Sequence, residues 1–357
     1  MDKKGYLLLA NGQLFEGVLR GAHKSVTAEL VFTTAMSGYM ETLTDPSYEG
    51  QIVIQTFPTI GNPGVIAPEV AGAHLSGYIV RELCDTPSNF RCEGKLDDFL
   101  KELDVPCLTD IDTRALTRCI RNNGVMNAAI LTEKPQDVAA AAAELANTTV
   151  CVTLPQEDVG TSTTAAGEGK HHVVLWNFGA KAAIQRELES RGCTVTCVPA
   201  NANAKDILRL APDGVVLGNG AGDPAYHADV AAQIAEVAKQ RIPMLGIGLG
   251  HQLLALSQGA ATSKMKYGHR GGNQPAKDVK TGQVYMTSQS HGYVVDADTL
   301  PENVALRYVN INDGTCEGLD YIGMPAFSVQ FHPEADGGPL DTRFLFDRFV
   351  AMMEGRK

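Results

Sequence analysis

The first half of the chain contains short runs in which hydrophobic and polar positions alternate, a pattern that predicts β-strands. Residues 6–10 and 13–18 alternate in this way on either side of Asn11-Gly12, a dipeptide typical of two-residue hairpin turns. Residues 27–34 and 51–57 are further predicted strands, separated by a loop rich in Gly, Thr, Asp and Pro. The first half is therefore predicted to be β-rich.

Helical spacing of apolar residues appears later in this half, at 96–103, 113–122 and 138–146. Asp110 and Asp112 are candidate N-caps for the second helix. Residues 156–170 then contain almost no large apolar side chain and are rich in Gly, Ser and Thr, which is typical of a linker. We therefore expect one domain at 1–155 and a second at 171–357.

After the linker, predicted strands and helices alternate strictly. The strands are at 172–178, 193–199, 214–218 and 243–247, and the helices are at 180–191, 206–210, 228–240 and 249–258. This alternation predicts parallel strands joined by crossover helices, hence an α/β doubly wound sheet. Ligands on such sheets bind at the carboxyl ends of the strands.

Composition narrows the class of protein. The chain has 357 residues, is 44% hydrophobic and has a net charge of −11, which argues against a protein that binds nucleic-acid phosphates. Its eight cysteines form no CxxC pair, so we expect reduced thiols in the cytoplasm rather than zinc or disulfides. No apolar run approaches the length of a membrane span, and the first five residues do not resemble a signal peptide.

Candidate chemistry lies where the strand at 243–247 runs into the next helix through Gly246, Gly248 and Gly250. A strand, a glycine-rich turn and a helix form the geometry of a nucleophile elbow, in which the turn residue points away from the sheet. A dinucleotide fingerprint would need a further glycine where His251 stands, and there is no GxxxxGK[ST] loop. The elbow is therefore the better interpretation.

The segment GIGLGHQLLA resembles the GICLGHQ elbow of class I, triad-type glutamine amidotransferases, with Gly248 in the place of the nucleophilic cysteine. Downstream, VQFHPEA is similar to the HPE motif of that family, which implies that His332 and Glu334 are the histidine and glutamate of a triad. A carboxylate orients the histidine in such sites, and the histidine handles the proton of the nucleophile.

The first half also resembles one branch of this family, the small subunits of carbamoyl-phosphate synthetases. The similar segments are FTT at 32–34, GY at 38–39, LTDPSY at 43–48, IGNPG at 60–64 and DIDTR at 110–114. The resemblance covers nearly the whole chain. It implies a small-subunit N-terminal domain at 1–155 and a class I glutamine amidotransferase domain at 171–357.

The resemblance further implies a heterodimer with a large subunit that makes carbamoyl phosphate from bicarbonate, ATP and ammonia for pyrimidine and arginine synthesis. ATP and metal ions are expected in the large subunit, and no cofactor or metal in this one. Neither nucleic acid nor a membrane is an expected partner.

A glutamine site is implied as well, carried over position by position. Its expected residues are Ser47, Gly220, Gly222, Leu249, Gln252, Ser290, Gly292 and Tyr293. Three positions depart from the family pattern: Ser290 replaces asparagine, Tyr293 replaces phenylalanine and Ala221 replaces proline. A shorter side chain at 290 removes a hydrogen bond to the substrate, so we expect glutamine to bind with lowered affinity.

Gly248 decides the activity that we expect. Glycine has no side chain, so no thioester can form there, and Cys193, Cys197 and Cys316 are better interpreted as structural than as substitute nucleophiles. Three hypotheses follow. The complex runs on free ammonia with this chain as its scaffold, or the chain is a nucleophile-deficient variant of an ordinary glutaminase subunit, or it is a non-enzymatic glutamine-binding protein.

Overall fold

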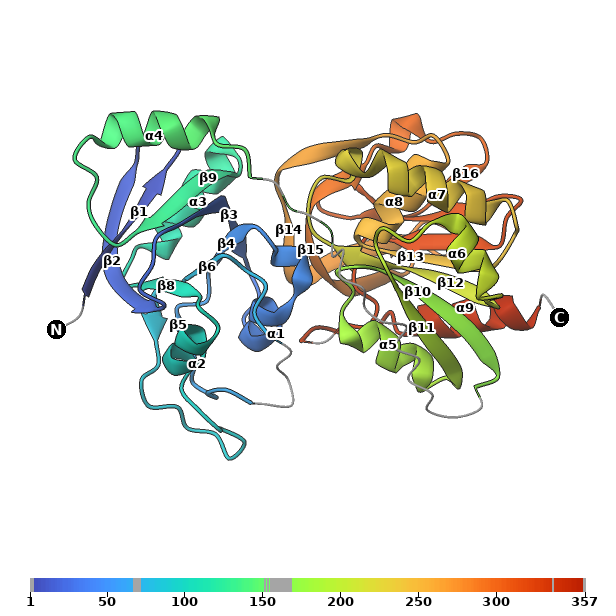
Figure 1. Ribbon diagram of the computed structural model, residues 1–357, viewed down its shortest axis with the longest axis horizontal. Coiled ribbons are helices and arrows are strands. Elements are labelled where there is room, and N and C mark those ends of the chain that lie inside the picture. Colours follow the sequence, from blue (N-terminus) through green and yellow to red (C-terminus); the bar gives the residue numbers. More distant parts are fainter. Residues whose placement is uncertain are drawn as a thin grey trace. The chain divides into compact units, whose positions relative to one another are not determined.

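The computed structural model describes residues 3–66, 72–150, 152, 154, 169–335 and 337–355. The chain forms two compact units, Met1–Val152 and Thr153–Lys357 (Figure 1). Most of the predicted linker, residues 156–168, lies outside the described residues. No helix in the described part of the chain is both long and apolar enough to cross a membrane.

Seven strands of the first unit close into a barrel in the order β1-β2-β8-β6-β4-β3-β9. Their bounds are β1 Lys3–Leu9, β2 Leu14–Gly21, β3 Val26–Thr33, β4 Gln51–Gln55, β6 Gly77–Ile79, β8 Pro106–Thr109 and β9 Met126–Leu131. Strands β5 (Thr59–Ile60) and β7 (Glu82–Leu83) form a separate pair. The hairpin prediction is confirmed, since β1 and β2 pair antiparallel around a turn in which Gly12 has φ +85°.

The helices of this unit are α1 (Tyr39–Thr44), α2 (Leu96–Glu102), α3 (Thr113–Asn123) and α4 (Val138–Asn147), with a 3-10 turn at Pro46–Tyr48. Asp112 caps α3, because its carboxylate accepts a hydrogen bond from Ala115 N at 2.9 Å. The expected loop between β3 and β4 instead contains α1. Tyr39, Met40 and Leu43 are buried there, so packing stabilises a helix that composition alone does not indicate.

The second unit is built on a nine-stranded sheet in the order β11-β10-β12-β13-β18-β17-β16-β14-β15. The strands are β10 His171–Phe178, β11 Cys193–Pro199, β12 Gly214–Gly220, β13 Met244–Ile247, β14 Thr262–Asp278, β15 Val284–Val295, β16 Val304–Asn310, β17 Cys316–Tyr321 and β18 Ala326–Val329. The first five in the sheet order are parallel and the rest antiparallel. The predicted doubly wound part is confirmed, and it carries an antiparallel extension.

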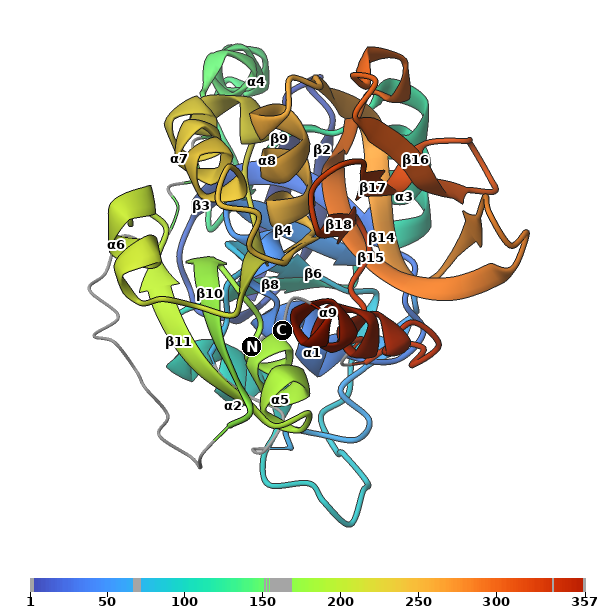
Figure 2. The same ribbon diagram turned by 90° about the vertical axis from the view of Figure 1, so that its right-hand side faces the viewer.

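Helices cover both faces of this sheet (Figure 2). They are α5 Ala182–Glu189, α6 Ala204–Arg209, α7 Ala228–Ala238, α8 Leu249–Ser257 and α9 Phe344–Glu354. Successive residues of β10 enter opposite cores: Val174 and Trp176 belong to one apolar cluster, and Val173 and Leu175 to another. This alternation is why a doubly covered strand reads as a continuous apolar run.

Candidate active site

The elbow at Gly248 joins β13 to α8. Gly248 has φ +57° and ψ −114°, a conformation that residues with a side chain adopt only under strain. Its N–H donates to Val329 O at 3.0 Å, and its carbonyl accepts from Gln252 N at 3.2 Å. The turn is therefore held by β18 on one side and by the first turn of α8 on the other.

The two flanking glycines let the helix approach the sheet. A Cβ on Gly250 would lie 2.2 Å from Leu217 O, and one on Gly246 would lie 2.8 Å from Gly250 O. Side chains at either position would force α8 away from the strands. The first N–H groups of such a helix have no carbonyl partner within the helix, and they can stabilise negative charge that develops beside the turn.

His332 and Glu334 follow the end of β18 and form a buried pair. His332 Nδ1 lies 2.8 Å from Glu334 Oε1, and the exposed fractions of the two residues are 2% and 0%. The backbone N–H of His332 donates to the carbonyl oxygen of Ser288 at 2.9 Å, which fixes the segment after β18 against β15. A carboxylate that accepts from Nδ1–H leaves Nε2 as the basic nitrogen of the ring.

This pair lies beside the elbow. A Cβ at Gly248 would lie 4.0 Å from His332 Cε1 and 3.1 Å from Asn219 Cβ. The structure thus brings together the three positions that the sequence resemblance assigned to a triad. The contact with Asn219 is tighter than ordinary packing, so a side chain at 248 requires a small adjustment of its neighbour.

Lys181 and Asn219 were missed by the sequence analysis. The side-chain Nζ of Lys181 lies 4.0 Å from Glu334 Oε1. The backbone N–H of Lys181 donates to Asn219 Oδ1 at 3.0 Å. Burial raises the pKa of Glu334, but attraction to His332 and Lys181 outweighs it and the net pKa is lowered. Lys181 follows β10 and Asn219 lies at the end of β12, so the carboxyl ends of adjacent strands were the available signal.

The side-chain amide of Gln252 forms hydrogen bonds within the protein. Its Nε2 donates to Tyr293 O at 2.8 Å and to Gln330 Oε1 at 2.9 Å, and the residue is 3% exposed. The amide therefore ties α8 to β15 and to the segment before His332. Gln252 therefore contributes to the predicted glutamine site by fixing the position of β15 relative to α8.

The remaining predicted residues of the second unit lie on β15 or near the elbow. Ser290 and Gly292 are on β15, and Ser290 Oγ is buried with no hydrogen-bond partner among the described residues. A Cβ on Gly220 would lie 2.2 Å from Phe178 O and 3.0 Å from Leu249 Cδ2. Gly222 has φ +97°, which favours glycine.

Ser47 belongs to the first unit, within the 3-10 turn at Pro46–Tyr48. Its N–H donates to Asp45 Oδ1 at 2.9 Å, and the residue is buried. Its approach to a bound glutamine stays a prediction.

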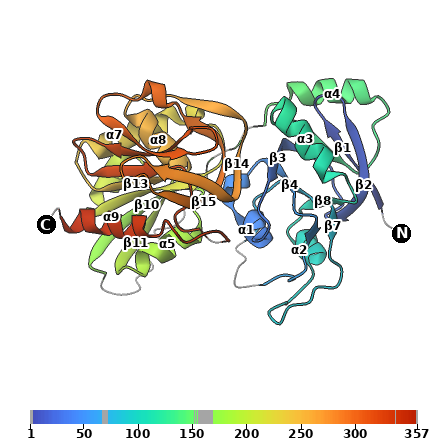
Figure 3. The same ribbon diagram turned by 180° about the vertical axis from the view of Figure 1, so that it is seen from behind.

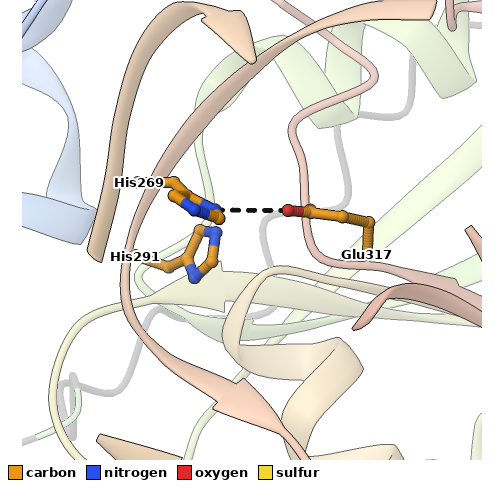
Figure 4. A group of neighbouring side chains, drawn as sticks. All are labelled: His269, His291 and Glu317. Carbon is orange, nitrogen blue, oxygen red and sulfur yellow. Dashed lines mark ion pairs between the residues drawn. The ribbon is translucent and has the colours of Figure 1, made fainter. Parts of the chain in front are cut away.

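A second buried cluster, formed by His269, His291 and Glu317, lies on β14, β15 and β17 (Figure 4). Imidazole and carboxylate are ligands that suit Zn²⁺. His269, however, already faces carboxylates through both nitrogens: Nδ1 lies 3.3 Å from Glu317 Oε1, and Nε2 lies 2.9 Å from Asp313 Oδ2.

The charges around His269 favour a proton there. Burial lowers the pKa of His269, but the interactions with Glu317 and Asp313 are stronger and the net pKa is raised. Burial also raises the pKa of Glu317 above its ordinary value. The cluster is therefore a buried network in which His269 links β14 to Glu317 on β17.

The candidate substitute thiols are poorly suited to nucleophilic attack. Cys316 is 1% exposed, and burial raises its pKa to about 12. Burial likewise raises the pKa of Cys193 to about 11 and that of Cys197 above its ordinary value. The thiolate is the reactive form, so burial disfavours all three as nucleophiles.

Comparisons with known proteins agree with both halves of the sequence resemblance. Residues 7–130 match the family model of the carbamoyl-phosphate synthase small chain, CPSase domain, and residues 174–352 match that of glutamine amidotransferase class-I. A carbamoyl phosphate synthase small chain of Staphylococcus saprophyticus is 46% identical over 365 residues, covering 100% of this chain and 98% of that protein. One from Lactococcus lactis is 43% identical over 360 residues, covering 99% of each.

Proposed function

The chain belongs to the family of carbamoyl phosphate synthase small chains, and from that premise we propose that it is a small subunit without glutaminase activity of its own. Its partner is a large synthase chain, which supplies the ATP, metal-ion and bicarbonate chemistry. The complex makes carbamoyl phosphate for pyrimidine and arginine synthesis. This chain needs no cofactor of its own.

Gly248 is the observation that carries the proposal. Hydrolysis of the glutamine amide by a triad begins with a bond from the nucleophile to the amide carbon, and Gly248 has no side-chain atom to form it. His332 keeps a basic nitrogen but has no thiol from which to take a proton. In a comparable triad, loss of the nucleophile lowers kcat by about 10⁶-fold.

We therefore expect the complex to use free ammonia, with this chain as a scaffold that the large chain binds. Glutamine is expected to bind weakly. The unpartnered hydroxyl of Ser290 supports this, because a serine reaches less far than the asparagine of the family pattern.

The experiment compares nitrogen sources on the purified complex of this chain with its large chain. Carbamoyl phosphate formation with ammonium chloride should be normal, and formation with glutamine should be near background. Equal turnover with both sources would overturn the proposal. If no large chain co-purifies, the non-enzymatic glutamine-binding hypothesis is favoured instead.

A second candidate function is that of a glutaminase subunit lacking only its nucleophile. The retained arrangement of His332, Glu334 and Lys181 beside the elbow favours it. It predicts that Gly248→Cys restores glutamine-dependent synthesis without other changes. If Gly248→Cys stays inactive while glutamine still binds, loss of function extends beyond the nucleophile and the second candidate fails.

A further inference from the structure

A basic cavity in the first unit takes no part in the site described above. It has a volume of about 560 Å³, which lies within the range of small-molecule sites. Three arginines line it, Arg114, Arg118 and Arg121, and the other lining residues are threonines. The arginines share one face of α3 because they are spaced by four and three residues.

The cavity lies beside the carboxyl ends of two parallel strands. Thr34 directly follows β3, Thr56 directly follows β4, and both residues line the cavity. Helix α3 contacts both strands (Figure 3). The fold therefore gathers three guanidinium groups, from a single helix, around one enclosed volume.

The positive charges of this face are not balanced within the chain. In the part of the chain that the structure describes, none of the three arginines takes part in an ion pair or a side-chain hydrogen bond. Helix α3 contains no acidic residue, although the whole chain has a net charge of −11. Like charges three or four residues apart on a helix repel, so an anion in the cavity would remove an unfavourable interaction.

The lining also indicates how large the anion is. It includes no apolar or aromatic side chain. A nucleobase is usually held by stacking on aromatic rings, and a docked polypeptide buries an apolar core. This cavity offers neither contact, so we expect a compact ligand recognised through its charge alone.

The hydrogen-bond donors of the cavity favour phosphate oxygens. The hydroxyls of Thr56 and Thr117 already donate to backbone carbonyls, at 2.9 Å to Thr33 O and 2.7 Å to Thr113 O. The arginines are therefore the main donors, and a guanidinium pairs with phosphate through two parallel hydrogen bonds. A phosphate group carries about 1.5 to 2 negative charges at pH 7, so two linked groups match three arginines better than one.

We propose that this cavity is a binding site for a compact polyphosphate anion, with Arg114, Arg118 and Arg121 pairing with the oxygens of successive phosphate groups. A rise of 1.5 Å per residue places the first and last of these arginines about 10 Å apart along the helix, which suits a chain of phosphates. The site is independent of the proposed function, because it lies in the other unit and takes a different ligand.

The test is isothermal titration of the full chain with inorganic pyrophosphate, in buffer without divalent cations. The wild type should bind it saturably, and the affinity should fall as salt is added, because the arginines are exposed. Orthophosphate should bind at least about tenfold more weakly, since it meets fewer arginines. Inorganic triphosphate and ATP should bind alike, because the cavity recognises phosphates and not a base.

Arg118→Ala should raise the dissociation constant for pyrophosphate about tenfold or more, because it removes charge-assisted hydrogen bonds. Arg118→Lys should bind more tightly than Arg118→Ala and more weakly than the wild type, since an ammonium keeps the charge but loses the paired geometry. Lys134→Ala is the matched control: Lys134 is exposed in the same unit, and its loss changes the net charge equally, so the effect should stay within about twofold. Circular dichroism checks that each variant is folded.

Three results would overturn the proposal. They are equal pyrophosphate binding by Arg118→Ala and the wild type, equal affinity of the wild type for orthophosphate and pyrophosphate, and tighter binding of a hexaglutamate peptide than of pyrophosphate. The last result would identify a surface for acidic polypeptides. None of them bears on the nitrogen source of the complex, so the proposed function would stand.

Discussion

His332 Nδ1 lies 2.8 Å from Glu334 Oε1 in the interior of the second unit, next to a turn whose central residue has no side chain. The carboxylate still orients the imidazole, and Lys181 still faces the carboxylate at 4.0 Å. The His332–Glu334 pair therefore keeps the geometry that the proposed site requires, while position 248 has no side-chain atom.

Replacing Glu334 by glutamine removes the charge that faces both His332 and Lys181. Breaking a buried pair leaves charge or hydrogen-bonding capacity without a partner, so the free energy of unfolding at pH 7 should fall by about 3 kcal/mol. Urea unfolding followed by circular dichroism measures this change. Glu236→Gln, which breaks an exposed pair with Lys239, should cost less than about 1 kcal/mol.

The loss of unfolding free energy in Glu334→Gln should depend on pH. The folded pKa of Glu334 is lowered, so its stabilisation is complete above the unfolded value of about 4.3 and is lost as the pH falls through the folded pKa. The difference between wild type and Glu334→Gln should therefore shrink as the pH falls below about 4.3. A difference that keeps growing below this pH would contradict the assignment.

Alanine at Gly248 should destabilise the fold even though it adds one methyl group. The backbone has φ +57° and ψ −114°, and the new Cβ would lie 3.1 Å from Asn219 Cβ. We expect the free energy of unfolding to fall by about 2 to 3 kcal/mol. Gly192→Ala is the control, because Gly192 has φ +76° with no atom within 4 Å of a Cβ, and it should cost only about 1 kcal/mol.

Truncating Gln252 to alanine should weaken the connection of α8 to β15 beside the predicted glutamine site. It leaves the buried Gln330 Oε1 without this donor and removes one of two hydrogen bonds to Tyr293 O, so the free energy of unfolding should fall by about 2 kcal/mol. Thermal and urea unfolding measure it. Gln240→Ala, at an exposed position, should stay within about 0.5 kcal/mol, and an equal cost at both positions would refute a bridging role.

His269 should titrate above the ordinary histidine range in the folded protein, as followed by NMR of its ring protons. Glu317→Gln should lower this pKa, and Asp313→Asn should lower it less, because Asp313 is partly exposed. Stabilisation from this network is full below about pH 6.5 and lost as the pH rises through the folded value. His227, whose pKa burial lowers, should not respond to either variant.

Cys316 should resist alkylation by iodoacetamide in the folded protein. Burial raises its pKa to about 12, so almost no thiolate forms at pH 8. Mass spectrometry should find the partly exposed Cys84 and Cys119 labelled first, and Cys316 labelled only after denaturation. Rapid labelling of Cys316 in the native state would reopen the question of a substitute nucleophile.

Much of the architecture could be predicted because it depends on local patterns. The hairpin around Gly12 follows from turn chemistry, and the strand-helix alternation of the second unit follows from periodicity. Helix α1 was missed because burial of Tyr39 and Leu43, rather than composition, stabilises it. The antiparallel extension from β14 to β17 was not predicted: β14 pairs with β15 and β16 with β17 as sequence neighbours, but the pairing of β14 with β16 skips a strand.

The candidate site, like the fold, could be predicted only in part from the sequence. Gly248, His332 and Glu334 could be identified from short motifs, because each motif is contiguous in sequence. Lys181 and Asn219 could not, because Lys181 follows β10 and Asn219 lies at the end of β12, and their proximity to Glu334 depends on the order of strands in the sheet.

The sequence by itself determined that position 248 lacks a thiol, since no fold can supply a missing atom. Only the tertiary structure decided that His332 and Glu334 remain paired beside the elbow, and that Gln252 serves the wall of the site. It also decided that Arg114, Arg118 and Arg121 line a cavity and that none of them pairs with an acidic side chain among the described residues. Gly248 and His332, like Gln252 and Tyr293, are far apart in the chain, and their proximity is set by packing of the whole sheet rather than by any local pattern.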